Sequence, residues 1–136
     1  MSTASVRTVS EYMTKDFVHV PAKMDTYDAT AHLLKHHVSA MPVVDESGKL
    51  VGILSERDLL EAFVQAEYYE SPPAFVEDLM TKEVVSVVPD TGIIEAAKIF
   101  SETRFHHLPI LEGEKVVGQI SRRTVLRAVR KMQHVK

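Results

Sequence analysis

The chain reads Val9-Ser-Glu-Tyr-Met-Thr-Lys-Asp-Phe-Val-His-Val20 and later Val76-Glu-Asp-Leu-Met-Thr-Lys-Glu-Val-Val-Ser-Val87. The Met-Thr-Lys centre of the first stretch returns 67 positions later, and this spacing holds without gaps from Ala29/Ala96 onward to the match of Pro42 with Pro109. One residue is then lost in a turn, and the match continues at an offset of 66. A period this long is typical of a duplicated unit and not of a solenoid.

Each copy shows the same succession of patterns. A β-branched stretch closed by a proline predicts a strand, and an amphipathic segment predicts a helix after it. In the first copy Asp25 and Asp28 supply the acidic start of that helix. Two short apolar strands around a Gly-containing turn predict a hairpin, and a last helix begins at Ser55 or Ser121. The expected strands are 17–20, 41–44 and 50–54, then 84–88, 108–111 and 116–120; the first helix of each copy is expected at about 26–37 and 93–103.

Strand–helix–strand–strand–helix, twice, predicts an α/β (α+β) fold with small sheets. We place the first repeat at residues 9–66, a linker at 67–75 and the second repeat at 76–130. A unit of about 60 residues buries little apolar surface by itself, so the two repeats are expected to share an interface. Pro72 and Pro73 are expected to stop the preceding helix and to stiffen the linker.

Composition narrows the classes of function. Of 136 residues, 45% are hydrophobic and 26% charged, with a net charge of −3, so no overall positive field favours nucleic acid. The chain has no cysteine, which excludes disulfides, thiolate catalysis and cysteine metal sites. The apolar runs are too short to span a bilayer, and the first residues lack a signal-peptide core. We expect a cytoplasmic protein that binds neither membrane nor nucleic acid.

The Met-Thr openings, the two apolar-Pro-apolar strands and the segment Val51-Gly-Ile-Leu-Ser-Glu-Arg-Asp58 resemble CBS (cystathionine beta-synthase) domains. The resemblance covers about residues 9–128 and implies a stand-alone tandem pair of β-α-β-β-α repeats, packed sheet to sheet with pseudo-two-fold symmetry. It implies up to two clefts that accept AMP, ADP, ATP or S-adenosylmethionine. It also implies homodimers that regulate a protein partner, for instance in energy sensing, and perform no catalysis.

Ser55-Glu-Arg-Asp58 matches the family's Ser/Thr-x-x-Asp signature, whose aspartate holds the ribose hydroxyls. A carboxylate suits that role because it accepts charge-assisted hydrogen bonds from two vicinal hydroxyls. The alternative is a capping box, a common start of helices. The two roles are compatible, because Ser55 can cap the helix while Asp58 points into a cleft.

The segment Phe105-His-His-Leu-Pro109 carries the other half of the expected site. By resemblance, His106 and His107 would contact phosphates and face the ribose aspartate of the other repeat. The alternative is that they are ordinary histidines at the start of a strand. The family's opening strand supplies adenine contacts. The expected nucleotide site comprises Ser55, Asp58, Thr81, Val85, His106, His107 and Pro109.

The second repeat departs from the signature, since it reads Ser121-Arg-Arg-Thr124 and lacks the acid. Two arginines in a first turn oppose the helix dipole. They either bind a phosphate or are solvated surface. Because the first repeat also has Ser39-Ala40 in place of the two histidines, we expect this second site to be weak or empty. It would comprise Thr14, Val18, Ser121, Arg123 and Thr124.

Other chemistry is less favoured by the sequence. His32, His36 and Asp28 share a helix face, but no Cys or His-Glu-x-x-His pattern accompanies them, so we expect no metal. The basic segment 122–136 lacks the interleaved aromatic residues of a nucleic-acid site. With no glycine-rich phosphate loop and no nucleophile–base set, the expected function is a nucleotide-binding regulator without a cofactor. A ligand-free scaffold protein and an S-adenosylmethionine binder are the alternatives.

Overall fold

The structure is a computed structural model, and it describes residues 7–69 and 75–134. The chain forms two compact units. The central unit comprises residues 18–84, and the terminal unit comprises 1–17 and 85–136. Each unit therefore contains the opening segment of the other repeat. The prolines expected to stiffen the linker, Pro72 and Pro73, lie outside the described residues.

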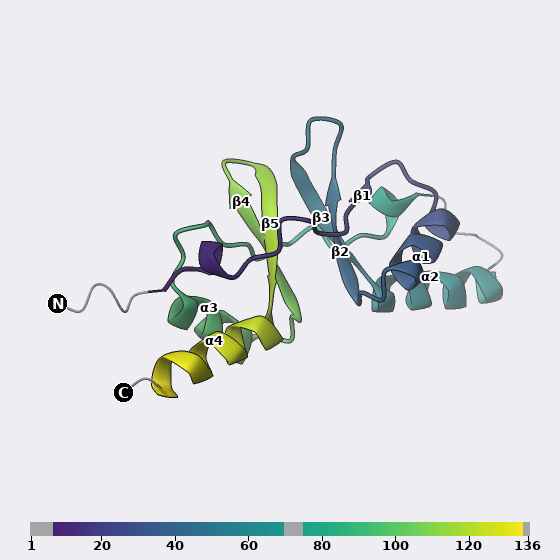
Figure 1. The fold of residues 1–136 in the computed structure, drawn as a ribbon. Helices are drawn as coiled ribbons and strands as arrows, with labels where there is room; N and C mark the ends of the chain where they lie inside the picture. Colours follow the sequence, from purple (N-terminus) through teal and green to yellow (C-terminus); the bar gives the residue numbers. More distant parts are fainter. Residues whose placement is uncertain (1–6, 70–74, 135–136) are drawn as a thin grey trace. The chain divides into compact units, whose positions relative to one another are not determined.

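The central unit is built on a three-stranded sheet in the order β1-β2-β3. β1 is parallel to β2, and β2 and β3 form the predicted antiparallel hairpin. Two helices, α1 and α2, lie side by side next to this sheet (Figure 1). The buried core includes Leu33, Met41, Leu54 and Leu59. The elements are β1 (Val20–Pro21), α1 (Thr26–Lys35), β2 (Ala40–Val44), β3 (Leu50–Ser55), α2 (Glu56–Tyr69) and the 3-10 turn η3 (Val76–Asp78).

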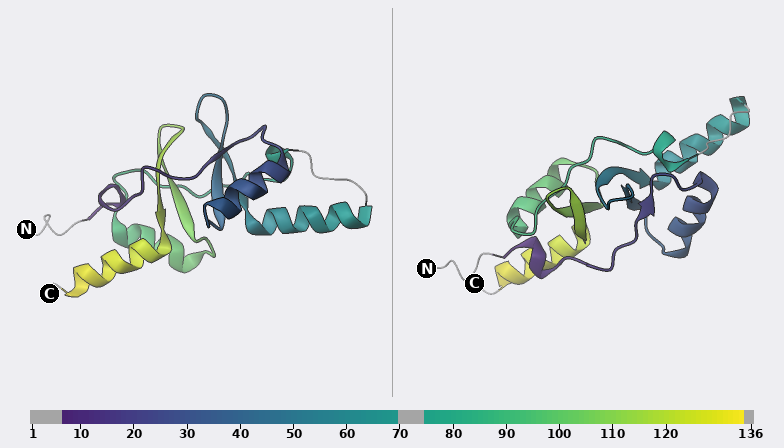
Figure 2. Two further views of the ribbon diagram at one scale, coloured as in Figure 1. Left: turned by 45° about the vertical axis from the view of Figure 1, so that its right-hand side comes forward. Right: turned by 90° about the horizontal axis from the view of Figure 1, so that it is seen from above.

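The terminal unit repeats this arrangement with a two-stranded sheet, β4-β5. Its helices α3 and α4 also lie side by side, as both views of Figure 2 show. The core gathers Ile93, Leu108, Ile110 and Ile120. The elements are the 3-10 turn η2 (Val9–Glu11), α3 (Ile93–Glu102), β4 (His107–Glu112), β5 (Lys115–Ser121) and α4 (Arg122–His134).

The predicted α/β class is confirmed, and both hairpins lie where the sequence predicts them. The opening strands are shorter than expected. The stretch 84–88 contributes a single parallel bridge from Val87 to Ile110. Two backbone hydrogen bonds form this bridge. Val87 N–H donates to the Pro109 carbonyl at 3.1 Å, and Leu111 N–H donates to the Val87 carbonyl at 2.8 Å. Pro89 follows two residues later and has no N–H to extend the ladder.

Each opening segment pairs with the hairpin of the other repeat. Thr81 exchanges two backbone hydrogen bonds of 2.9 Å with Ile53 of β3. Thr14 does the same with Gln119 of β5, at 2.8 and 3.0 Å, and Figure 1 shows this purple segment crossing β5. A glycine permits each approach, because a Cβ on Gly52 would lie 2.9 Å from the Thr81 carbonyl oxygen. This pairing places Thr81 beside the end of β3.

Candidate functional site

Asp58 and Ser55 form a reciprocal pair where β3 ends and α2 begins. The Ser55 N–H donates to Asp58 Oδ2 at 3.0 Å, and the Asp58 N–H donates to Ser55 Oγ at 3.1 Å. Both residues are half-buried. The capping interpretation of the Ser-x-x-Asp signature is therefore confirmed, and the carboxylate sits at the positive end of the helix dipole.

Thr81 joins this pair from the opening segment of the second repeat. Its hydroxyl lies 3.4 Å from both carboxylate oxygens of Asp58 and donates to them. A carboxylate has about four lone-pair sites, so Asp58 retains acceptor capacity beyond these contacts. The structure thus brings together three residues predicted for the nucleotide site, and they form one polar cluster within the central unit.

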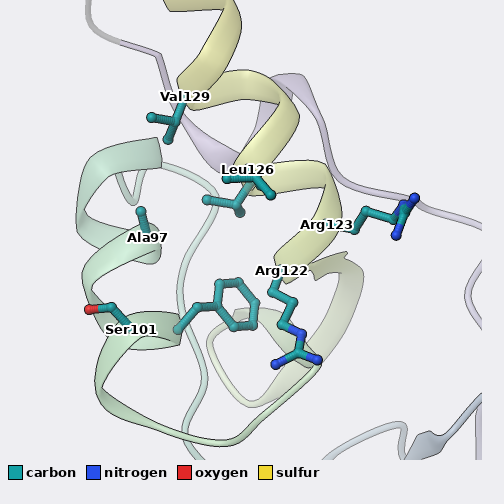
Figure 3. Close-up of a pocket in the computed structure, with 8 residues that line it drawn as sticks. Ala97, Ser101, Arg122, Arg123, Leu126 and Val129 are labelled. Atoms are coloured by element: carbon teal, nitrogen blue, oxygen red, sulfur yellow. The ribbon is translucent and has the colours of Figure 1, made fainter. Parts of the chain in front are cut away.

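The corresponding place in the terminal unit holds hydroxyls without a carboxylate. The Thr124 N–H donates to Ser121 Oγ at 3.0 Å, and the Ser121 hydroxyl donates to Thr124 Oγ1 at 3.0 Å. Thr14 pairs with β5 as described above. Arg123 is exposed, and its side chain extends away from α3 (Figure 3). Val18 belongs to the central unit and packs against its core.

His107 begins β4 and is half-buried. Among the described residues its buried Nδ1 has no hydrogen-bond partner. Burial, and secondarily the neighbouring His106, lowers the pKa of His107. The exposed His106 accepts the Arg122 N–H on its carbonyl at 2.9 Å.

The remaining predicted residues also belong to the terminal unit. Pro109 is buried in β4, and Val85 is 39% exposed. The predicted nucleotide residues therefore fall into two sets, one in each unit. Ser55, Asp58 and Thr81 form the first set, and Val85, His106, His107 and Pro109 form the second.

The histidines of α1 make a ring contact. The ring centroids of His32 and His36 are 4.6 Å apart, and the rings are arranged edge to face. Burial, followed by the nearby His36, lowers the pKa of His32. Across residues 7–69 and 75–134, no group of three His, Cys, Asp or Glu side chains could hold a metal ion. In that same part of the chain, the helices are too short or too polar to cross a membrane.

A duplicated α/β unit with a Ser-x-x-Asp helix start defines a class of tandem-repeat protein. The model of the CBS domain family matches residues 9–65 and 76–131. Because these two matches cover most of the chain, the chain belongs to the CBS domain family.

Similar proteins include stand-alone pairs of such domains. The mitochondrial CBS domain-containing protein CBSX3 of Arabidopsis thaliana is 33% identical over 107 residues, which are 76% of this chain and 52% of that protein. The chain thus matches about half the length of CBSX3. The crystal structure of CBSX2 in complex with AMP has a TM-score of 0.82 at 30% identity and covers 93% of this chain and 98% of that chain.

A further solved structure is the CBS domain pair of protein MJ0100 in complex with 5'-methylthioadenosine and S-adenosyl-L-methionine. Its TM-score is 0.77 at 25% identity, and the match covers 90% of this chain and 98% of that chain. These likenesses establish the fold of the pair.

Sequence reasoning missed Ile53 as the backbone partner of Thr81. Met80 and Gly52, which take part in this approach, repeat as Met13 and Gly118. In both units the methionine lies against the glycine, where a Cβ would come within 2.6 or 2.7 Å of the sulfur. The sequence repeats both residues but does not say which methionine meets which glycine, so only the structure shows this exchange of opening segments.

Proposed function

We propose that this chain is a regulatory module that binds an adenine nucleotide of the AMP, ADP or ATP class. The observation that carries this function is the cluster of Asp58, Ser55 and Thr81. It presents a half-buried carboxylate at a helix start, with acceptor capacity left over. The AMP held by the similar protein CBSX2 supports the same ligand class.

In this role Asp58 accepts the two vicinal hydroxyls of the ribose. Hydrogen bonds to an ionised acceptor are about twice as strong as neutral ones, so this contact anchors the ligand. Ser55 holds the carboxylate in place, and the Thr81 hydroxyl offers a further polar contact. The exposed apolar side chain of Val85 suits an adenine face, and His106 and His107 are donors for phosphate, whereas Pro109 is buried in β4.

The second site, with Thr14, Val18, Ser121, Arg123 and Thr124, is the weaker of the two. Thr124 presents a neutral hydroxyl where the central unit has a carboxylate, and that hydroxyl already accepts from Ser121. A neutral acceptor holds a ribose diol less strongly than an ionised one. We therefore propose one nucleotide per chain at concentrations that saturate the first site.

The test is titration calorimetry with AMP, ADP and ATP on the chain and on two variants. Asp58→Asn removes the charge and should weaken binding at least about tenfold, since bonds to charged groups are worth about 1.5–3 kcal/mol. Asp28→Asn is the matched control, because Asp28 is an exposed acid in the first turn of α1 in the same unit. An equal loss in both variants, or unchanged binding in Asp58→Asn, contradicts the ribose role.

S-adenosylmethionine is the second candidate ligand, because it is bound by the similar domain pair of MJ0100. It also contains an adenosine, so Asp58 would serve it in the same way. Adding S-adenosylmethionine to the calorimetric series decides whether the chain prefers it or an adenine nucleotide. If none of the four ligands binds at millimolar concentration, the chain acts as a ligand-free scaffold instead.

Several finer expectations belong to the same proposal. We expect a regulator and not an enzyme, an energy-sensing role through ATP or AMP, a homodimer, and an unidentified protein partner. We also expect a cytoplasmic location, although one similar protein carries the word mitochondrial in its name. Fractionation of cells that produce the tagged chain checks the location, and native mass measurement checks retained nucleotide.

A further inference from the structure

Two histidines at the end of α1 lie one helical turn apart. His32 and His36 are four positions apart and therefore share one face of the helix. The His36 N–H donates to the His32 carbonyl at 3.2 Å, so a backbone hydrogen bond joins the same two residues. Their ring centroids are 4.6 Å apart. The helix does not continue past them, because His37 has a φ of 55°. The backbone thus holds the two rings close together.

The ring of His32 is oriented by a second contact within the central unit. It makes a hydrogen bond to the backbone of His19, and this bond acts to raise the pKa of His32, as donation to a carbonyl does. A neutral imidazole that donates through one nitrogen keeps a lone pair on the other. Histidines that bind metals are typically oriented in this way, by donating their second nitrogen to a carbonyl or a carboxylate. His32 therefore has the arrangement of a metal ligand.

Both rings are suited to meet at one ion. Burial, followed by the neighbouring His36, lowers the pKa of His32, which keeps this ring neutral near pH 7. The neutral imidazole is the form that binds a metal. His36 is exposed, and its ring turns about the outer side-chain torsion at little cost. The fixed His32 ring and the turning His36 ring can therefore each direct one nitrogen to a common point.

The separation of the rings favours one class of ion. A metal lies about 2.0–2.1 Å from an imidazole nitrogen, so two rings at a right angle around it have centroids about 4.5 Å apart. At the tetrahedral angle that structural zinc prefers, the centroids are about 5.2 Å apart. The centroid distance of 4.6 Å between His32 and His36 matches the right angle. Square-planar or tetragonal nitrogen ligands are typical of Cu²⁺ and Ni²⁺.

We propose that His32 and His36 form a two-imidazole site for a divalent transition-metal ion that prefers tetragonal nitrogen ligands, and that Cu²⁺ binds there most tightly. Across residues 7–69 and 75–134 no third His, Cys, Asp or Glu completes such a group, so water fills the remaining positions. The lack of a third ligand, which disfavours a structural metal, makes this site an open one that exchanges its ion. Because the folded helix brings the rings together, the bound ion also stabilises the folded chain.

Metal binding at α1 is independent of the proposed nucleotide site. The two sites share no residue, because the nucleotide cluster consists of Asp58, Ser55 and Thr81. The Asp58→Asn variant should therefore bind Cu²⁺ as the original chain does. A failure of nucleotide binding and a failure of metal binding are separate results.

Titration calorimetry of the untagged chain with Cu²⁺, Ni²⁺ and Zn²⁺, in the absence of nucleotide, tests the site. We expect Cu²⁺ to bind more tightly than the other two. Loss of an outer partner of a ligand already costs about tenfold or more in metal affinity, so His36→Asn should weaken Cu²⁺ binding at least as much. His37→Asn is the matched control, because it removes the next exposed histidine and Asn tolerates the positive φ. Unchanged affinity in His36→Asn, or an equal loss in His37→Asn, overturns the proposal.

NMR locates the ion without any substitution, because Cu²⁺ is paramagnetic and broadens the signals of nearby nuclei. At Cu²⁺ concentrations below that of the chain, the ring signals of His32 and His36 should broaden first. Broadening that begins at His106 and His107 places the ion in the terminal unit and overturns the proposal.

A displaced histidine tests the spacing of the pair. Leu34→His in the His36→Asn chain restores the number of histidines but places the new ring two positions from His32, which is a different face of the helix. Leu34 is 62% exposed, so the change leaves the core intact. We expect Cu²⁺ affinity to remain as low as in His36→Asn alone. Recovery of the original affinity would show that any additional histidine suffices and would overturn the two-imidazole site.

Discussion

At the scale of single residues, His107 is a half-buried polar group at a position where the other repeat has an apolar residue. Its matched position in the first repeat is Ala40, which starts β2 as His107 starts β4. The buried ring costs free energy when it is protonated, which is why the pKa of His107 is lowered from 6.5. The residue therefore links the stability of the terminal unit to pH.

We predict that His107 makes the chain less stable in mild acid. Below an unfolded pKa of about 6.5 the unfolded chain takes up a proton on this ring more readily than the folded chain, so stability falls as pH falls through that value. Urea unfolding at about pH 7.5 and about pH 5.5 measures the effect. His107→Ala should narrow the difference in unfolding free energy between the two conditions. An unchanged difference contradicts the prediction.

The residue-level predictions succeeded where chemistry is local. Ser55 and Asp58 are three positions apart at a helix start, and that spacing is sufficient to predict their reciprocal hydrogen bonds. The burial of His107 Nδ1 was not predictable in this way. It depends on which segments pack over the start of β4, and sequence spacing does not determine that packing.

At the scale of elements, Gly52 and Gly118 decide how closely the opening segments approach the hairpins. A Cβ at Gly52 would lie 2.6 Å from Met80 Sδ and 2.9 Å from the Thr81 carbonyl oxygen. The methionine side chain can move, but the backbone oxygen cannot move without breaking its bond to the Ile53 N–H. The backbone contact therefore decides the cost.

We predict that Gly52→Ala destabilises the chain by about 1–3 kcal/mol, the usual range for overpacking. The measurement is the free energy of unfolding in urea. Gly92→Ala is the control, because it adds the same methyl group at a position with room for it. The nearest atom to its Cβ would be the Arg7 carbonyl oxygen at 3.8 Å. If Gly52→Ala costs no more than Gly92→Ala, the close contact with Thr81 does not limit the packing.

The sequence predicted the hairpins well and the opening strands poorly. Alternating apolar residues around Gly48 and the Gly113 turn are a local signal, and both glycines adopt the positive φ that such turns need. The β-branched stretch 84–88 has the composition of a strand, but only Val87 finds a partner. The composition of a segment determines how readily its backbone is extended. The number of residues that pair in a sheet depends on whether another strand lies beside the segment, and that strand comes from elsewhere in the chain.

At the scale of the whole molecule, the order of repeats along the chain differs from the order of compact units. The repeats follow one another, yet residues 18–84 form one unit and the two ends of the chain form the other. Val76 is fully buried in the core of the central unit, although it opens the second repeat. Sequence similarity alone locates the repeats and does not reveal this exchange.

This exchange predicts which half of the chain can fold alone. A fragment of residues 18–84 keeps the whole central unit, including Val76 and the Thr81–Ile53 pairing. A fragment of residues 1–69 contains the first repeat and has nearly the same length, but it leaves β3 without that partner. Burial of Val76 is worth about 1.5–3 kcal/mol, a large share of the stability of so small a unit.

We therefore expect fragment 18–84 to show the more cooperative thermal transition by circular dichroism and the better dispersed amide spectrum by NMR. Fragment 18–84 carrying Val76→Ala is the matched control, since it keeps the length and removes only the buried side chain. It should move toward the behaviour of fragment 1–69. Equal stability of the two fragments, or a stable fragment 1–69 alone, would mean that the repeat and not the compact unit is what folds.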